Sequence, residues 1–183
     1  MQDKNKKLIY LISGPLGVGK STTSKELARN IKQCVLIEGD NLLHMFKGES
    51  QPSWEERLNL TWENILALTR NFIINDLNVV IDFVVEDELD WFCKHISDLN
   101  VELRYIILRA DKDKLIERLN RRGDIESLER SLYLLNKMET SPSNNQFIYD
   151  TTVKQPNEIA QDVIDGTGYN VFIDTSRLTN GKR

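Results

Sequence analysis

One glycine-rich segment of the sequence has the residue types and the spacing that bind phosphate groups. Residues 14–21 read Gly-Pro-Leu-Gly-Val-Gly-Lys-Ser and match the pattern G-x-x-x-x-G-K-[ST] at every defined position. Glycine lets such a backbone curl until its N–H groups converge on phosphate oxygens. An apolar run precedes the segment and a helical pattern follows it, so we predict a phosphate-binding loop (P-loop) rather than a purely structural turn.

Two side chains of this loop have separate predicted roles. Lys20 is expected to reach the β and γ phosphates of a nucleoside triphosphate and to act in catalysis, and the Ser21 hydroxyl is expected to ligate Mg²⁺. The helix that begins near Lys20 adds its positive N-terminal dipole. The residues predicted to bind the nucleotide here are Gly14, Pro15, Leu16, Gly17, Val18, Gly19, Lys20, Ser21 and Thr22.

Two aspartates lie near the ends of predicted strands, where ligands gather in parallel sheets. Asp40 is a candidate catalytic base that would accept a proton from a bound substrate hydroxyl during phosphoryl transfer. A helix N-cap is the alternative, because a short helical pattern follows it. Asp82 ends the apolar run 78–81 and is interpreted as a Mg²⁺ ligand or a substrate contact.

Two arginines, Arg118 and Arg122, are four residues apart and therefore share one helix face. Their planar guanidinium groups suit the clamping of phosphate, and Arg122 is a catalytic candidate. A solvated basic face paired with nearby glutamates is the alternative. Gly123 then allows a turn into a cover at about residues 122–130, whose closure would exclude water. Arg130 is predicted to point into the same site.

Three side chains with rings have two open interpretations each. His44 follows Asp40 closely and either faces the substrate or is a surface or packed histidine. Trp54 and Trp62 are predicted to pack a long helix onto the sheet, and a stacking surface for a substrate ring is the alternative.

The elements that must position these residues alternate between short apolar runs and longer helical patterns. Such alternation predicts an α/β fold in which parallel strands are joined by right-handed crossovers, with helices on both faces of the sheet. The predicted strands are 8–13, 34–37, 79–85, 101–108 and 147–149, with a further short one at 169–173. The predicted helices are 21–31, 54–77, 87–99, 112–122, 125–138 and 156–164.

Size and composition narrow the class of protein. The 183 residues suit one domain, 1–183, and the net charge of −4 argues against a nucleic-acid partner. Cys34 and Cys93 lack the spacing of a metal site or a disulfide framework. The run 8–13 is too short for a signal peptide, and no stretch approaches a membrane span of ~20 apolar residues. We expect a cytoplasmic monomer or homodimer that binds a small-molecule substrate and no membrane.

These motifs, in this order, resemble the small-molecule P-loop kinases. That group contains gluconate kinase, shikimate kinase, adenylylsulfate kinase and chloramphenicol phosphotransferase, and the resemblance extends over residues 8–165. Gluconate kinase is the most similar member. Its Gly-Asp and Leu-His pairs resemble residues 39–44, and its Glu-Arg-Leu…Arg run resembles residues 117–122. Met45 stands where that family has proline, and the histidine and aromatic residues of its lid are missing.

The resemblance implies a three-layer P-loop NTPase fold. Its sheet would have five parallel strands in the order 2-3-1-4-5, with a small lid. Arg118 would lie near the adenine and Arg122 near the transferring phosphate. The implied activity is ATP- and Mg²⁺-dependent phosphorylation of a hydroxyl on a metabolite, such as the sugar acid gluconate. Alternatives are an antibiotic phosphotransferase of the chloramphenicol type and a nucleotide-binding protein without kinase activity. The sequence leaves open the acceptor, the choice between ATP and GTP, and the oligomeric state.

Overall fold

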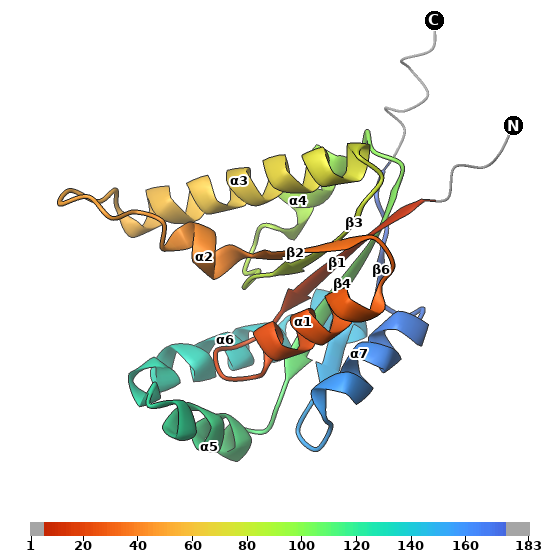
Figure 1. Cartoon of the computed structure of the whole chain (residues 1–183). Coiled ribbons are helices and arrows are strands. Elements are labelled where there is room, and N and C mark those ends of the chain that lie inside the picture. The colour runs from red at the N-terminus through yellow and green to blue at the C-terminus, as the bar shows by residue number, and fades with distance from the viewer. Residues whose placement is uncertain (1–5, 175–183) are drawn as a thin grey trace, which may run out of the picture.

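A six-stranded sheet forms the middle layer of the molecule (Figure 1). The computed structural model describes residues 6–174. The strands are β1 (Lys7–Ser13), β2 (Cys34–Glu38), β3 (Asn78–Asp82), β4 (Val101–Arg109), β5 (Ile148–Asp150) and β6 (Asn170–Val171). The first five are parallel in the order β2-β3-β1-β4-β5, and β6 pairs antiparallel with β4. The predicted strand order 2-3-1-4-5 is therefore confirmed.

Helices cover both faces of this sheet, as the α/β pattern predicts. In Figure 1, α3 and α4 lie on one face, and α1 and α7 lie together on the other. The helices are α1 (Lys20–Asn30), α2 (Gly39–Leu43), α3 (Trp54–Ile74), α4 (Leu89–Ile96), α5 (Lys112–Arg122), α6 (Leu128–Thr140) and α7 (Pro156–Asp165). Short 3-10 turns, η1 (Ile125–Ser127) and η2 (Pro142–Phe147), flank α6.

Strand β1 shows how the sequence supplies both layers of the core. Ile9 and Leu11 belong to the cluster under α3 and α4, whereas Tyr10 and Ile12 belong to the cluster under α1 and α7. Successive side chains of a strand point to opposite faces, so a strand covered on both faces must be apolar throughout. The continuous apolar run of β1 is the sequence signature of this central position.

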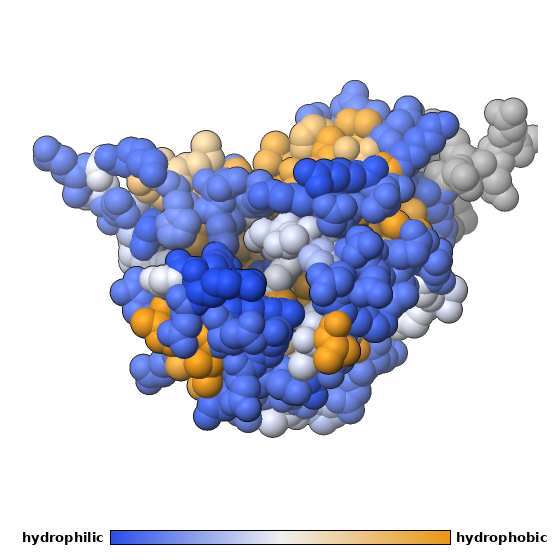
Figure 2. Space-filling model, turned by 60° about the horizontal axis from the view of Figure 1, so that its bottom comes forward, coloured by the Kyte–Doolittle hydropathy of each residue, from blue (hydrophilic) through white to orange (hydrophobic). Residues whose placement is uncertain are grey.

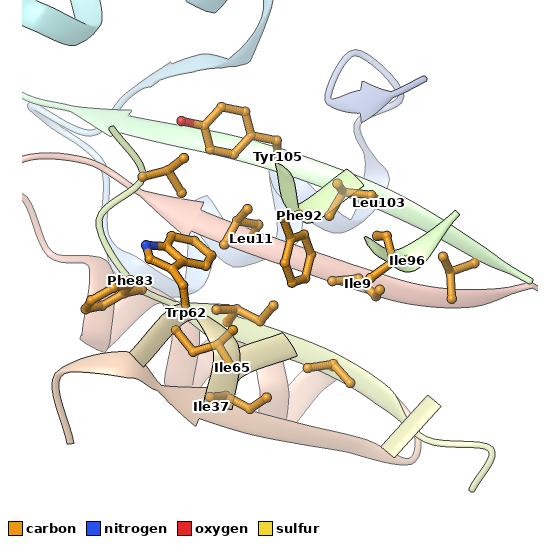
Figure 3. Packing of buried hydrophobic residues seen from close by; sticks show 14 of the residues in the cluster. Ile9, Leu11, Ile37, Trp62, Ile65, Phe83, Phe92, Ile96, Leu103 and Tyr105 are labelled. Carbon is orange, nitrogen blue, oxygen red and sulfur yellow. The ribbon is translucent and has the colours of Figure 1, made fainter. Parts of the chain in front are cut away.

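Trp62 anchors α3 on the sheet (Figure 3). Its ring packs edge-on against Phe83 and Phe92, with ring centroids 5.5 and 6.1 Å away. The packing predicted for Trp62 is confirmed, but the same prediction is wrong for Trp54, which is 54% exposed. The α3 side chains that pack on this core begin at Leu58, one turn after Trp54.

Local differences from the sequence prediction lie at the ends of strands and helices. Strand β3 ends at Asp82 rather than residue 85, because the Val85 N–H donates to the Ser13 hydroxyl (2.9 Å) instead of continuing the ladder. The short helix α2 was expected only as part of the cap alternative for Asp40, and it begins at Gly39, before that residue. Helix α4 begins at Leu89, two residues later than expected, and β5 begins at Ile148, one residue later.

The side of the molecule below the sheet is mostly hydrophilic, with small separate hydrophobic patches (Figure 2). Such scattered exposed apolar residues are normal for a folded protein surface. In the part of the chain that the structure describes, no helix has both the length and the apolarity to cross a membrane.

A pair of phenylalanine substitutions tests the core that supports α3 and α4. Phe92→Ala should lower the free energy of unfolding by about 3–5 kcal/mol, because the Phe92 ring is 0% exposed and its removal leaves a cavity. Phe172→Ala, at an 89% exposed ring, should change it by no more than about 0.5 kcal/mol. Urea unfolding followed by circular dichroism measures both; equal effects would contradict this core.

Candidate active site

The P-loop adopts a backbone conformation that favours glycine at three of its positions. Gly14 has φ +142°, Gly17 has φ +79° and Gly19 has φ +108°, all in the region that side chains disfavour. A Cβ on Gly14 would lie 2.4 Å from the Leu108 carbonyl oxygen, and one on Gly17 would lie 2.9 Å from the Leu119 side chain. The glycine spacing in the sequence therefore reflects both backbone angle and close packing.

Lys20 folds back over this loop from the first turn of α1. Its ammonium donates to the carbonyl oxygens of Gly14 (3.0 Å) and Pro15 (3.2 Å). Gly19 is the N-cap of α1, contributes no side-chain cap bond and is followed by no acidic residue in the first turn. The N-terminal end of α1 is therefore left to an anion, as the helix dipole favours.

Two distant side chains hold further P-loop carbonyls. Ser131 of α6 donates from its hydroxyl to the Leu16 carbonyl (2.7 Å), and Arg118 of α5 donates to the Val18 carbonyl (2.7 Å). A peptide plane carries its N–H opposite its C=O, so fixing these carbonyls from outside turns amides toward the interior of the loop. The arrangement is suited to surround a phosphate.

Two cavities meet beside Lys20. A cavity of about 270 Å³, which we call the phosphate cavity, is lined by Gly19, Lys20, Ser21, Thr22, Arg122 and Asp124 among others. A second cavity of about 220 Å³, the acceptor cavity, is lined by His44, Trp54, Phe83 and Arg130 among others. Leu16, Lys20 and Asp40 line both. Of the three predicted catalytic residues, Lys20 and Asp40 therefore lie at the boundary of the two cavities, whereas Arg122 lines only the phosphate cavity of the two.

A third cavity, of about 570 Å³, lies on the α5 side of the P-loop and is lined by Arg118 and Arg122 among others. Its other wall is the loop between β5 and α7, residues 152–156. Arg118 ties this loop to the P-loop, because its second nitrogen donates to the Thr151 carbonyl (3.2 Å). The Arg118–Arg122 helix face is therefore turned toward the site and not only toward solvent.

Asp82 is buried, 6% exposed, and interacts with Lys20 and with the hydroxyl of Ser21. Burial raises the pKa of the Asp82 carboxyl, although Lys20 and Ser21 oppose the shift. Burial lowers the pKa of the Lys20 ammonium, against the attraction of Asp82 and Asp40. Asp82 is grouped with Lys20 and Ser21 and is not among the residues lining the acceptor cavity.

The residues Ser21 and Asp82 fit a magnesium ion that arrives with a nucleotide. Together they offer a hydroxyl and a carboxylate oxygen, and Mg²⁺ usually takes one or two protein oxygens besides phosphate and water. Over residues 6–174, no group of three or more His, Cys, Asp or Glu side chains is placed to hold a metal by itself. The metal role of both residues remains a prediction.

Asp40 is not the N-cap of α2. Glu38 occupies that position, and Asp40 lies in the first turn, exposed to solvent at the cavity boundary. The helix-cap alternative is therefore wrong for this residue. Gly39 allows the chain to pass this close to the core, since a Cβ there would lie 2.4 Å from the Phe83 ring.

The remaining predicted site residues, His44 and Arg130, both line the acceptor cavity. Arg130 forms an ion pair with Glu86, which lies between β3 and α4. Sequence reasoning missed Ser131 and Thr151, because their contacts join segments 115 and 33 residues apart and no local pattern marks them.

The P-loop, the buried aspartate at the end of the neighbouring strand and the strand order together define a P-loop NTPase fold. The chain belongs to the AAA_33 family: the model of this family, described as an AAA domain, matches residues 9–141.

Known proteins of this fold include several kinases. A guanylate kinase of Prochlorococcus marinus (strain MIT 9312) is 25% identical over 88% of this chain and 97% of its own length. An APS kinase of Mycobacterium tuberculosis, solved with AMPPNP and APS, is 18% identical, covers 87% of this chain and 96% of its own, and has a TM-score of 0.62. A gluconokinase of Sinorhizobium meliloti 1021 is 17% identical, covers 86% and 89%, and has a TM-score of 0.57. The two structures share the fold with this chain.

Replacing Arg118 tests whether the outer support of the P-loop matters for nucleotide binding. Arg118→Ala removes the bonds to Val18 and Thr151 and should weaken the binding of Mg–AMPPNP about tenfold or more. Isothermal titration calorimetry measures the Kd. Arg29→Ala, at an exposed arginine paired with Glu26, is the matched control and should leave the Kd unchanged. An unaltered Kd in Arg118→Ala would show that the loop keeps its shape without this contact.

Proposed function

We propose that this protein is an ATP-dependent kinase that transfers the γ-phosphoryl group to a hydroxyl of a small molecule. The observation that carries the proposal is the meeting of two cavities at Lys20 and Asp40. One cavity has the P-loop on its wall, and the other lies on the far side of the same two side chains. A donor phosphate and an acceptor hydroxyl would face each other there, which is the positioning that phosphoryl transfer requires.

The proposed mechanism assigns one task to each residue. Asp40 accepts the proton of the acceptor hydroxyl, whose oxygen forms the new bond to the γ-phosphorus. The bond from that phosphorus to the β–γ bridging oxygen breaks, and ADP leaves with the bonding electrons. Lys20 and Arg122, which both line the phosphate cavity, neutralise charge on the transferring group. Magnesium, when bound with the nucleotide through Ser21 and Asp82, would neutralise further phosphate charge.

Similarity supports a kinase of this kind but not a particular acceptor. The relatives named above act, by their names, on different acceptors, and their identity to this chain is 25% or less. We propose a small-molecule acceptor rather than a nucleic acid, because the net charge is −4. ATP is the proposed donor by analogy with the APS kinase, whose structure holds AMPPNP.

A protein that binds a nucleotide without phosphorylating an acceptor would have no use for a carboxylate placed between the two cavities. Asp40 is therefore the residue that separates this alternative from a kinase. An antibiotic phosphotransferase remains within the proposed class, since it too would bind its acceptor hydroxyl beside Asp40.

Removing the P-loop lysine tests the donor half of the proposal. Lys20→Ala should abolish ATP-dependent turnover, because the γ-phosphate loses its nearest positive charge. The variant should remain folded by circular dichroism. Lys25→Ala, at an exposed lysine that pairs with Glu38, should keep full turnover. ADP release with Mg–ATP is the readout, and unchanged turnover in Lys20→Ala would remove this side chain from the mechanism.

Replacing the proposed base tests the acceptor half. Asp40→Asn should lower kcat by about 10²–10⁴-fold while the Kd of Mg–AMPPNP stays within about twofold, since the amide cannot accept the hydroxyl proton. Asp113→Asn, in the first turn of α5, is the control and should keep the wild-type kcat. Full acceptor-dependent turnover in Asp40→Asn would reject the general-base role.

A further inference from the structure

The acceptor cavity has largely apolar walls. Leu43 of α2, Trp54 and Leu58 of α3, Phe83 after β3 and Leu134 of α6 all line its volume of about 220 Å³. Phe83 and Leu134 are buried core residues, 3% and 1% exposed, so their positions are fixed by packing. Trp54 is 54% exposed and presents ring surface that no core residue covers completely.

The charges of this cavity are predominantly negative. Three carboxylates line it, those of Asp40, Glu86 and Glu88, against the ammonium of Lys20 and the guanidinium of Arg130. His44 also lines it, but its ring is exposed, where solvent screens any charge.

Both full positive charges already have partners. Lys20 donates to two P-loop carbonyls and faces the phosphate cavity. Arg130 forms an ion pair with Glu86, which also pairs with Lys137 (3.4 Å). Among the described residues lining the cavity, no cation is therefore left to neutralise an anionic acceptor.

We infer that the acceptor is an alcohol without negative charge, neutral or cationic, whose hydroxyl lies at Asp40 and whose body is an apolar ring or chain. The inference rests on the proposed kinase function and names its substrate class. An apolar body would lose its water against Trp54, Phe83 and Leu134, which favours binding. A carboxylate would lose its water beside Asp40 and Glu88 without an unpaired cation to compensate it, which opposes binding.

This conclusion disfavours the sugar acid suggested by the sequence resemblance. A polyhydroxy acid needs a cation for its carboxylate and polar partners for each buried hydroxyl. The Leu43, Leu58 and Leu134 side chains on the walls offer neither. A positively charged amino group, in contrast, would be attracted by the carboxylates at the cavity.

A series of three alcohols with one common benzyl group tests the inference. They are 3-phenyl-1,2-propanediol, which is neutral, phenylalaninol, which is cationic, and 3-phenyllactate, which is anionic. Gluconate and sorbitol are the polar comparison pair. Binding to the protein saturated with Mg–AMPPNP is measured by calorimetry, and ADP release is measured with Mg–ATP. The neutral and cationic benzyl alcohols should bind at least about ten times more tightly than 3-phenyllactate, gluconate and sorbitol.

Two substitutions that each remove one negative charge distinguish the effect of freeing Arg130 from the effect of a changed net charge. Glu86→Gln frees Arg130 from its partner and should tighten the binding of 3-phenyllactate about tenfold relative to the neutral diol. Asp87→Asn removes the same charge one residue away and breaks one ion pair of Lys137, which keeps its pair with Glu86. Arg130 stays paired with Glu86, so the ratio of the affinities for 3-phenyllactate and the neutral diol should stay as in the wild type. An unchanged ratio in Glu86→Gln would overturn the charge argument.

Two substitutions in α3 test the apolar wall. Trp54→Ala should weaken binding of the neutral benzyl diol about tenfold, because the exposed ring lines the cavity. Ile74→Ala, at a 68% exposed residue at the other end of the same helix, should leave binding unchanged. Equal binding by the wild type and Trp54→Ala would overturn the role of this wall.

The two proposals fail in different ways. If the benzyl alcohols bind with the expected preference but no compound releases ADP, the kinase function fails and the ligand class of the cavity stands. If ADP release or binding favours 3-phenyllactate or gluconate, the inferred acceptor class is overturned. The kinase function is then judged by turnover alone. Absence of binding by both the neutral and the cationic benzyl alcohols at millimolar concentration also overturns it.

Discussion

The site depends on hydrogen bonds that side chains donate to the P-loop carbonyls. Lys20, Arg118 and Ser131 each donate to one or more of these carbonyls, from three different helices. These bonds fix the peptide planes of the loop, which would otherwise have to be ordered at a cost in conformational entropy on binding. Two of these bonds attach α5 and α6 to the loop, so helices far apart from it in sequence support its shape.

The parallel sheet supplies the second constraint. Strands β1 and β3 are neighbours, with Ile12 opposite Asp82 in register, so the P-loop and the buried aspartate emerge at the same edge. Strand β2 lies beside β3 and ends next to Gly39 and Asp40. Because parallel strands end at one edge, the phosphate cavity and the acceptor cavity are adjacent.

The core next to this edge shapes the acceptor cavity. Phe83 packs against Trp62 on its buried side and lines the cavity with the rest of its surface, and Gly39 is the residue small enough to pass beside its ring. The wall of the acceptor cavity and the hydrophobic core therefore share side chains here. A change of acceptor would come more readily through the exposed Trp54 or the Glu86–Arg130 pair than through Phe83.

The sequence by itself determined the P-loop and the strand–helix alternation, because both depend on local patterns: glycine spacing, apolar runs and helical periodicity. It placed Trp62 in the core correctly and Trp54 wrongly, since both fit the same periodicity and only packing distinguishes them. The cap alternative for Asp40 and the roles of Ser131 and Glu86 were decided only by tertiary structure. Those contacts join residues distant along the chain, and charge pairing and cavity shape exist only once the helices have packed.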